Sequence, residues 1–157
     1  MKIDRKEQLI ATNRRARHDF TITASYEAGI VLKGTEVKSL RARQCSLQDA
    51  HCKFLSKDSL ELYLYHIHIN PYEHGNIQNH EPKRPRKLLL NFRELKKLKN
   101  AVSEKGVTLI PLSIYFSGHL VKIELGLCVA KRKYDKREAK KELEAKREIG
   151  RKMKNYK

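Results

Sequence analysis

The chain has 157 residues, enough for one domain with a single packed core and a tail. Its 35 Lys and Arg residues against 18 Asp and Glu give a formal net charge of +17, so we expect a polyanionic partner. No apolar run approaches the roughly 18–20 residues of a membrane-spanning helix, and the charged residues 1–7 lack the apolar stretch of a signal peptide. Three separated cysteines, Cys45, Cys52 and Cys128, indicate buried thiols in a reducing compartment, so we expect a cytoplasmic protein.

Short β-strands are predicted for most of the first 130 residues. Strand-like runs of apolar and β-branched residues occur at 20–22, 29–32, 46–55, 60–69 and 107–116. A turn at Ser117-Gly118 leads from the last run into a strand with apolar residues at alternate positions: Val121, Ile123, Leu125, Leu127 and Val129. This period of two is typical of a strand with one buried face.

Two helices are predicted between these strands. Asn91 and Glu94 have the spacing of a capping box. Three apolar residues behind them form a stripe that would be buried, before Gly106 ends the helix: Leu95, Leu98 and Val102. A shorter helix is predicted over residues 36–42. Residues 70–87, with three Pro and one Gly, are predicted to form a long loop, and loops of this length are usually functional.

The fold class that follows is mainly β, with about six short strands in a small closed antiparallel barrel over residues 1–130. Residues 131–157 contain 13 Lys and Arg against 5 acidic residues, a net charge of +8, and only a broken apolar stripe. Such a segment cannot bury enough apolar surface to stay ordered by itself. The sequence therefore predicts a basic C-terminal tail that is disordered alone and becomes helical on a partner.

Three basic clusters lie at the junctions between predicted segments. They are Arg14, Arg15, Arg17 and His18; Lys83, Arg84, Arg86 and Lys87; and Lys131, Arg132 and Lys133. Side chains of this kind contact phosphates and release counterions, whereas a single basic run is more often only a solvated surface. Three runs in a chain of this charge favour nucleic acid. RNA is favoured over DNA because the sequence lacks a basic zipper, a zinc finger and a helix-turn-helix, and a barrel with basic loops binds RNA by shape.

Catalytic motifs are absent from the sequence, which has no phosphate-binding glycine loop, no CxxC pair and no nucleophile elbow. A zinc site could be assembled from Cys52, His66, His68, His74 and His80, and an acid–base pair for RNA cleavage from His18 and His119. Strand alternation instead places His66 and His68 on one face with Leu62 and Leu64, which favours ordinary, partly buried histidines. We therefore expect no enzyme activity, no metal and no cofactor.

Five segments in order resemble the small protein B family, the bacterial tmRNA-binding or SsrA-binding proteins. The segments are 13–20 (NRRARHDF), 26–30 (YEAGI), 34–41 (GTEVKSLR), 86–91 (RKLLLN) and 135–137 (DKR). The resemblance runs from about residue 11 to the C-terminus. It implies an oligonucleotide-binding-type barrel with three helices and a disordered basic tail. It also implies binding to the tRNA-like domain of tmRNA and its delivery to stalled ribosomes, the first steps of trans-translation.

Carried over by position, the family's tmRNA-contacting residues are Glu27, Leu89, Asn91 and Lys122. A carboxylate can accept hydrogen bonds from a base amino group or a 2′-hydroxyl, and a lysine can meet a phosphate. Two alternatives stay open, since Asn91 could serve only as a helix cap and Leu89 only as part of the core.

The tail residues implied to act in the ribosomal decoding centre and the mRNA path are Lys131, Arg132, Lys133, Tyr134, Asp135, Lys136 and Arg137. The chain departs from the family pattern at Val129-Ala130, where lysine and glycine are usual, and at Tyr134, where histidine is usual. Tyr134 keeps an aromatic ring that can stack. The implied protein is a monomer that meets elongation factor Tu only through charged tmRNA. The alternative is a ribosomal or rRNA-assembly protein.

Overall fold

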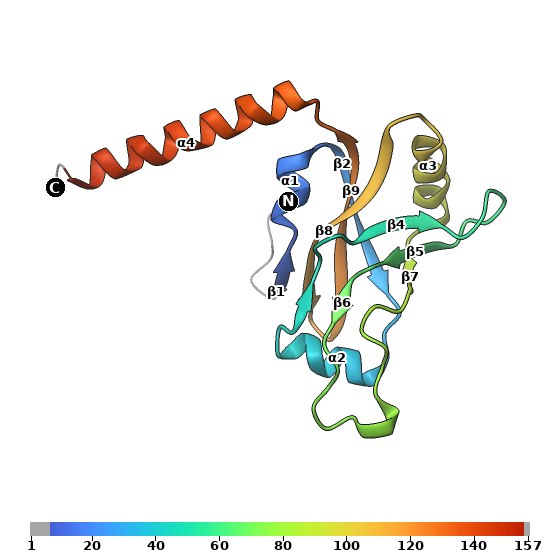
Figure 1. The fold of residues 1–157 in the computed structure, drawn as a ribbon. Coiled ribbons are helices and arrows are strands. Elements are labelled where there is room, and N and C mark those ends of the chain that lie inside the picture. The colour runs from blue at the N-terminus through green and yellow to red at the C-terminus, as the bar shows by residue number, and fades with distance from the viewer. Residues whose placement is uncertain (1–6, 156–157) are drawn as a thin grey trace.

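The structure is a computed structural model that describes the backbone of residues 7–155 and all side chains in that range except those of Glu7, Lys133, Tyr134 and Asn155. Its strands are β1 (Glu7–Thr12), β2 (Phe20–Ile30), β3 (Cys45–Ser46), β4 (His51–Phe54), β5 (Leu62–Tyr65), β6 (His68–Ile69), β7 (Arg86–Leu89), β8 (Val107–Ser117) and β9 (Leu120–Ala130). Its helices are α1 (Arg14–Asp19), α2 (Gly34–Arg41), the 3₁₀ turn η1 (Asn76–Gln78), α3 (Phe92–Val102) and α4 (Lys133–Asn155). Figure 1 shows α4 extending away from the β-rich body.

Six strands form a ring of antiparallel pairings. The order is β8-β4-β5-β7-β2-β9, and β9 pairs back with β8, while β1 adds to the outer side of β8. A separate two-stranded sheet joins β3 to β6. The mainly β class and the number of strands in the ring agree with the sequence prediction. Besides the 3₁₀ turn, residues 7–155 contain four α-helices, where two or three were predicted.

The β8–β9 hairpin is the element that the sequence predicted best. Ser117 pairs with Leu120 across the turn, and Gly118 adopts a φ of +60°, which favours glycine. Val121, Ile123 and Leu125 are buried, as their alternation predicted, whereas Val129 is partly exposed near the end of β9. A Cβ atom at Gly126 would lie 2.9 Å from Leu112 Cδ1, so a larger residue there would force the buried Leu112 side chain to shift.

The predicted helices at 36–42 and after Asn91 are confirmed as α2 and α3. Leu40 and Leu98 are fully buried in the core, and Leu95 and Val102 pack partly buried against it. The Asn91 N–H donates to Glu94 Oε2 at 3.3 Å, which is the Glu94 half of the predicted capping box. The helix ends at Val102, four residues before Gly106.

Several elements differ from the sequence prediction. No strand was predicted for β1, and the predicted strands at 46–55 and 60–69 are each divided, into β3 and β4 and into β5 and β6. Residues 20–30 form one continuous strand, not two, because β2 pairs with β9 along its whole length around a bulge between Ile22 and Ala24. Strand β7 occupies residues 86–89, where the long loop was predicted to end. Helix α1 was not predicted, because only Ala16 of its six residues is buried. Asn13 starts it by accepting from the Ala16 N–H at 3.1 Å.

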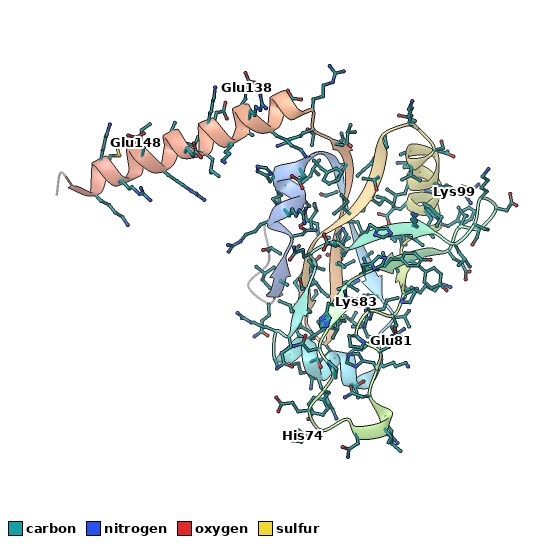
Figure 2. All side chains as sticks on the ribbon, in the orientation of Figure 1. His74, Glu81, Lys83, Lys99, Glu138 and Glu148 are labelled. Carbon is teal, nitrogen blue, oxygen red and sulfur yellow. The ribbon has the colours of Figure 1, made fainter. Side chains whose placement is uncertain are left out.

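The tail is helical in the structure, where the sequence predicted disorder. Lys, Glu, Arg and Ala, which favour helices, make up most of α4, and Glu148 and Lys152 form an i,i+4 ion pair at 3.7 Å. Figure 2 shows Glu138 and Glu148 projecting from the helix. Leu143, Ile149 and Met153 remain 48–72% exposed, so the distal helix packs against no core.

The cysteines are free thiols, with Cys52 and Cys128 buried and Cys45 half-buried. Burial raises the pKa of the Cys45 and Cys128 thiols to about 11, so both are protonated near neutral pH. Across residues 7–155, no helix has the length and apolar character needed to cross a membrane.

Candidate nucleic-acid interface

Four residues that are distant in sequence line one depression of about 410 Å³: Glu27, Leu89, Asn91 and Lys122. The ring of strands brings them together, because Gly29 of β2 pairs with Leu89 of β7 on one side and with Lys122 of β9 on the other. Asn91 lies two residues after the end of β7 and is the N-cap residue of α3. The structure thus places the four predicted tmRNA-contacting residues at a single site.

A carboxylate and an ammonium group meet at the centre of this depression. Lys122 Nζ lies 3.8 Å from Glu27 Oε1, and the Tyr115 hydroxyl donates a hydrogen bond to Glu27 Oε2. Tyr115 is buried, so it orients a carboxylate that is itself 37% exposed. Tyr115 was not predicted from the sequence, although its place opposite Lys122 on the predicted β8–β9 hairpin could have indicated it. The site therefore offers a held acceptor for base amino or 2′-hydroxyl groups beside a cation for phosphate.

Leu89 and Asn91 both face solvent. Leu89 is 52% exposed, which rules out the alternative that it serves only as a core residue. Asn91 is exposed at the start of α3, so its position is compatible with both a helix boundary and a ligand contact. Phe92 next to it is 60% exposed under Lys96 Nζ, which lies 4.7 Å from the ring centroid. Phe92 was not predicted as a site residue from the sequence.

The second basic cluster divides into buried and exposed members. Arg86 and Glu36 are both 0% exposed, and Arg86 Nε donates to Glu36 Oε1 at 2.8 Å. Arg84 Nη2 donates to Glu36 Oε2 at 2.6 Å, and Arg86 Nη1 donates to the Ile67 carbonyl at 3.1 Å. The prediction that Arg86 contacts RNA is therefore wrong, because its guanidinium is enclosed and committed to protein acceptors. Arg84 keeps 22% exposure but shares the same carboxylate.

The remaining cations of this cluster lie at the surface. Lys83 is exposed, and Figure 2 shows it on the body of the molecule, away from α4. Lys87 is half-buried and pairs with Glu61 at 2.8 Å, a contact that raises the pKa of the Lys87 ammonium because it stabilises the charged form. Lys83 is therefore available for phosphate contact, whereas Lys87 shares its charge with Glu61.

The first basic cluster forms the exposed surface of α1. Arg14, Arg15, Arg17 and His18 are all exposed. Asp19 at the end of the helix accepts from His18 Nδ1 at 2.9 Å and pairs with Arg15 Nε at 3.4 Å. These contacts hold the pKa of the Asp19 carboxyl below its usual range, with the His18 hydrogen bond as the largest cause. Asp19 thus neutralises part of a surface that is otherwise cationic.

The root of the tail is attached to α1. The Lys131 N–H donates to the Asp19 carbonyl at 3.0 Å, Lys131 Nζ donates to the Arg17 carbonyl at 3.3 Å, and Lys136 Nζ lies 3.6 Å from Asp19 Oδ1. Arg132, Asp135 and Arg137 are exposed. The side chains of Lys133 and Tyr134 lie outside the described residues. The first and third clusters therefore form one basic surface, at α1 and the start of α4.

The histidines do not assemble into a metal site. No group of three or more His, Cys, Asp or Glu residues suited to a metal occurs within the part of the chain that the structure describes. The prediction that His66 and His68 share a face with Leu62 and Leu64 is wrong, because His66 has a φ of +60° and interrupts the alternation. Leu62 and Leu64 are buried, but His66 is exposed and the next buried residue is Ile67.

Comparison with known proteins connects this site to one family. A family model described as "SmpB protein" matches residues 10–155. The SsrA-binding protein of Carboxydothermus hydrogenoformans is 53% identical over 143 residues, covering 91% of this chain and 94% of the relative. That of Acidothermus cellulolyticus is 54% identical over 144 residues, covering 92% and 89%.

A solved structure is also similar. It carries the description "tmRNA-SmpB: a journey to the center of the bacterial ribosome", and its matching chain is 48% identical with a TM-score of 0.66, covering 82% of this chain and 92% of that one. The family match spans nearly the whole sequence, including the residues of the depression, α1 and α4. The chain belongs to the SmpB family.

Proposed function

We propose that this chain binds the tRNA-like domain of tmRNA and delivers it to stalled ribosomes for trans-translation, which rescues the ribosome and tags the nascent chain. The observation that carries the proposal is the convergence of Glu27, Leu89, Asn91 and Lys122 at one depression in a chain of net charge +17. The names of the relatives and the description of the similar structure support it.

In this proposal the ring of strands acts as an oligonucleotide-binding-type barrel. Glu27, held by Tyr115, accepts from RNA hydroxyl or amino groups, while Lys122 and the exposed Lys83 and Lys87 contact phosphates. Residues 1–130 thus clamp the RNA as a domain. The protein then occupies the volume that an anticodon arm would fill in an ordinary tRNA.

The tail from residue 131 onward carries the ribosome-directed part of the function. The basic surface at α1 and the start of α4 faces the decoding centre, and α4 enters the empty mRNA path, where its exposed apolar stripe and cations meet rRNA. The ribosome stabilises the helix, because Leu143, Ile149 and Met153 stay 48–72% exposed in the free protein. The protein acts as a cytoplasmic monomer and reaches elongation factor Tu only through charged tmRNA. Peptidyl transfer is performed by the ribosome, so the chain itself catalyses nothing.

Glu27→Ala should weaken binding to the tRNA-like domain of tmRNA by about 1–3 kcal/mol, the contribution of one good base contact. Fluorescence anisotropy with the labelled RNA measures the change. Glu73→Ala is the matched control, because it removes the same charge from an exposed loop position outside the depression. Equal affinities for the two variants would exclude Glu27 from the interface. Wild-type binding to rRNA with no preference for tmRNA would instead indicate an rRNA-assembly protein.

Binding to the same RNA should weaken steeply with salt, because each neutralised phosphate releases counterions. Lys122→Ala should reduce the slope of log K against log salt by roughly 0.7–0.9, the contribution of one phosphate contact. Lys105→Ala, an exposed cation on the turn before β8, should leave the slope unchanged. A flat profile for the wild-type protein would point to a partner other than RNA.

A further inference from the structure

A strip of aromatic rings lies on the outer face of β4 and β5. His51 of β4 pairs directly with Tyr65 of β5, and their rings stack with centroids 5.7 Å apart and planes 17° apart. Tyr63, two residues earlier on β5, lies 6.5 Å from Tyr65, and His66 lies 5.2 Å from His51. Four rings are therefore contiguous on a surface that is separate from the depression at Glu27 and Lys122.

The strip faces solvent because of strand alternation. Leu62 and Leu64 are fully buried. Tyr63, which lies between them, and Tyr65, which follows Leu64, therefore point outward and are half-buried. The left-handed backbone at His66 interrupts this alternation and places a second consecutive ring at the surface, where it is exposed. The strip therefore borders solvent at the partly exposed rings of Tyr63 and Tyr65 and at the exposed ring of His66.

The charges around the strip favour an anionic ligand. Tyr63 pairs with Lys53 of β4 on one side and with Lys87 of β7 on the other. Two carboxylates lie near the strip and each is paired with a cation: Glu61 with Lys87 at 2.8 Å, and Asp49 with Arg15 at 3.3 Å. Burial lowers the pKa of His51, with smaller contributions from His66 and Lys53, so its ring is neutral near pH 7 and stacks without desolvating a charge.

We propose that His51, Tyr63, Tyr65 and His66 form a stacking platform for unpaired bases of single-stranded RNA. Flat rings interleaved with lysines match such a ligand, because every base has a π-face and every linkage a phosphate. Strand β7 lies between the two sites in the order β4-β5-β7-β2-β9. Its Lys87 pairs with Tyr63 of the platform, and its Leu89 lines the depression. A folded RNA held in the depression can thus extend an unpaired segment across β7 onto the rings. The platform rests on the proposed function only in taking RNA as the ligand.

The test measures binding of the full-length chain to a fluorescein-labelled oligoadenylate of about 12 nucleotides, within the site size of comparable surfaces. Tyr65→Leu removes one ring, and His66→Asn removes another while keeping a residue that tolerates positive φ. Each should weaken binding roughly tenfold, on the scale of one lost base stack. Tyr65→Phe, which keeps the ring, should bind like wild type. Tyr72→Leu is the matched control, a half-buried loop tyrosine with Lys38 Nζ 5.0 Å from its ring centroid.

Equal oligoadenylate affinity for Tyr65→Leu, His66→Asn and Tyr72→Leu would overturn the platform and leave the rings as cross-strand packing. If Tyr65→Leu lowers the melting temperature, its oligoadenylate affinity no longer reports on the ring alone. His66→Asn then tests the platform by itself, because it changes an exposed side chain. Titration of the same proteins with the tRNA-like domain of tmRNA separates the two proposals. Glu27→Ala should lose affinity for that RNA and keep oligoadenylate binding. A wild-type protein without preference for tmRNA over tRNA refutes the proposed function, and the oligoadenylate titration still decides the platform.

Discussion

Glu36→Ala should lower the free energy of unfolding by about 3–5 kcal/mol, because it leaves a buried guanidinium without its counter-ion. Glu36 is fully buried, accepts from Arg84 and Arg86, and also accepts from the Lys33 N–H at 2.7 Å at the start of α2. The two arginines attach the end of the long loop to α2. Urea unfolding monitored by circular dichroism measures the loss.

The matched control is Glu94→Ala. Glu94 occupies the same third position in α3 and accepts from the Asn91 N–H at 3.3 Å, but none of the ion pairs described within residues 7–155 joins it to an arginine. Glu94→Ala should lower the free energy of unfolding by about 0.5–2 kcal/mol, the range of a capping contact alone. The double variant Glu36→Leu/Arg86→Met should recover part of the loss, because it removes both buried charges together. Similar destabilisation by Glu36→Ala and Glu94→Ala would show that the ion cluster contributes little beyond capping.

Deletion of residues 133–157 should abolish tagging of nascent chains on stalled ribosomes while leaving affinity for the tRNA-like domain of tmRNA near wild type. The reason is that the depression is built by β2, β7, α3 and β9, none of which needs α4, and Lys131 keeps its hydrogen bonds to α1. A reconstituted translation assay with a truncated message measures tagging. Loss of tmRNA affinity in the deletion variant would show that the two parts are not independent.

Point variants in the full-length chain refine this result. Tyr134→Ala should impair tagging, and Tyr134→Phe and Tyr134→His should retain it, because a ring can stack on a purine of the decoding centre. A peptide of residues 131–157 should show little helix by circular dichroism, since nucleation is costly and its apolar residues have nothing to pack against. Full tagging by Tyr134→Ala would leave the flanking charges as the working part of the tail.

Local sequence patterns were sufficient to predict elements whose turns, caps and buried faces are defined by residues close together in the chain. The β8–β9 hairpin follows from strict alternation around a glycine turn, and α3 follows from a capping box ahead of an apolar stripe. The concentration of charge in residues 131–157 marked the tail, and five ordered segments identified the family. Residues Glu27, Leu89, Asn91 and Lys122 were found through that resemblance, since no local pattern connects them.

Tertiary structure decided what depends on partners far away in the chain. Lys83 and Arg86 belong to one basic run, yet Lys83 is exposed and Arg86 is buried. Arg86 is buried because it donates to Glu36, a residue fifty positions away in the sequence that lies within the core. Strand β2 is continuous because β9 supplies its hydrogen bonds, and Tyr115 orients Glu27 because the ring brings β8 beside β2 through β9. A residue's type sets the contacts that it can make, but burial and the identity of the partner arise only when the strands pair, and these two factors decide whether a cation binds RNA or holds the fold together.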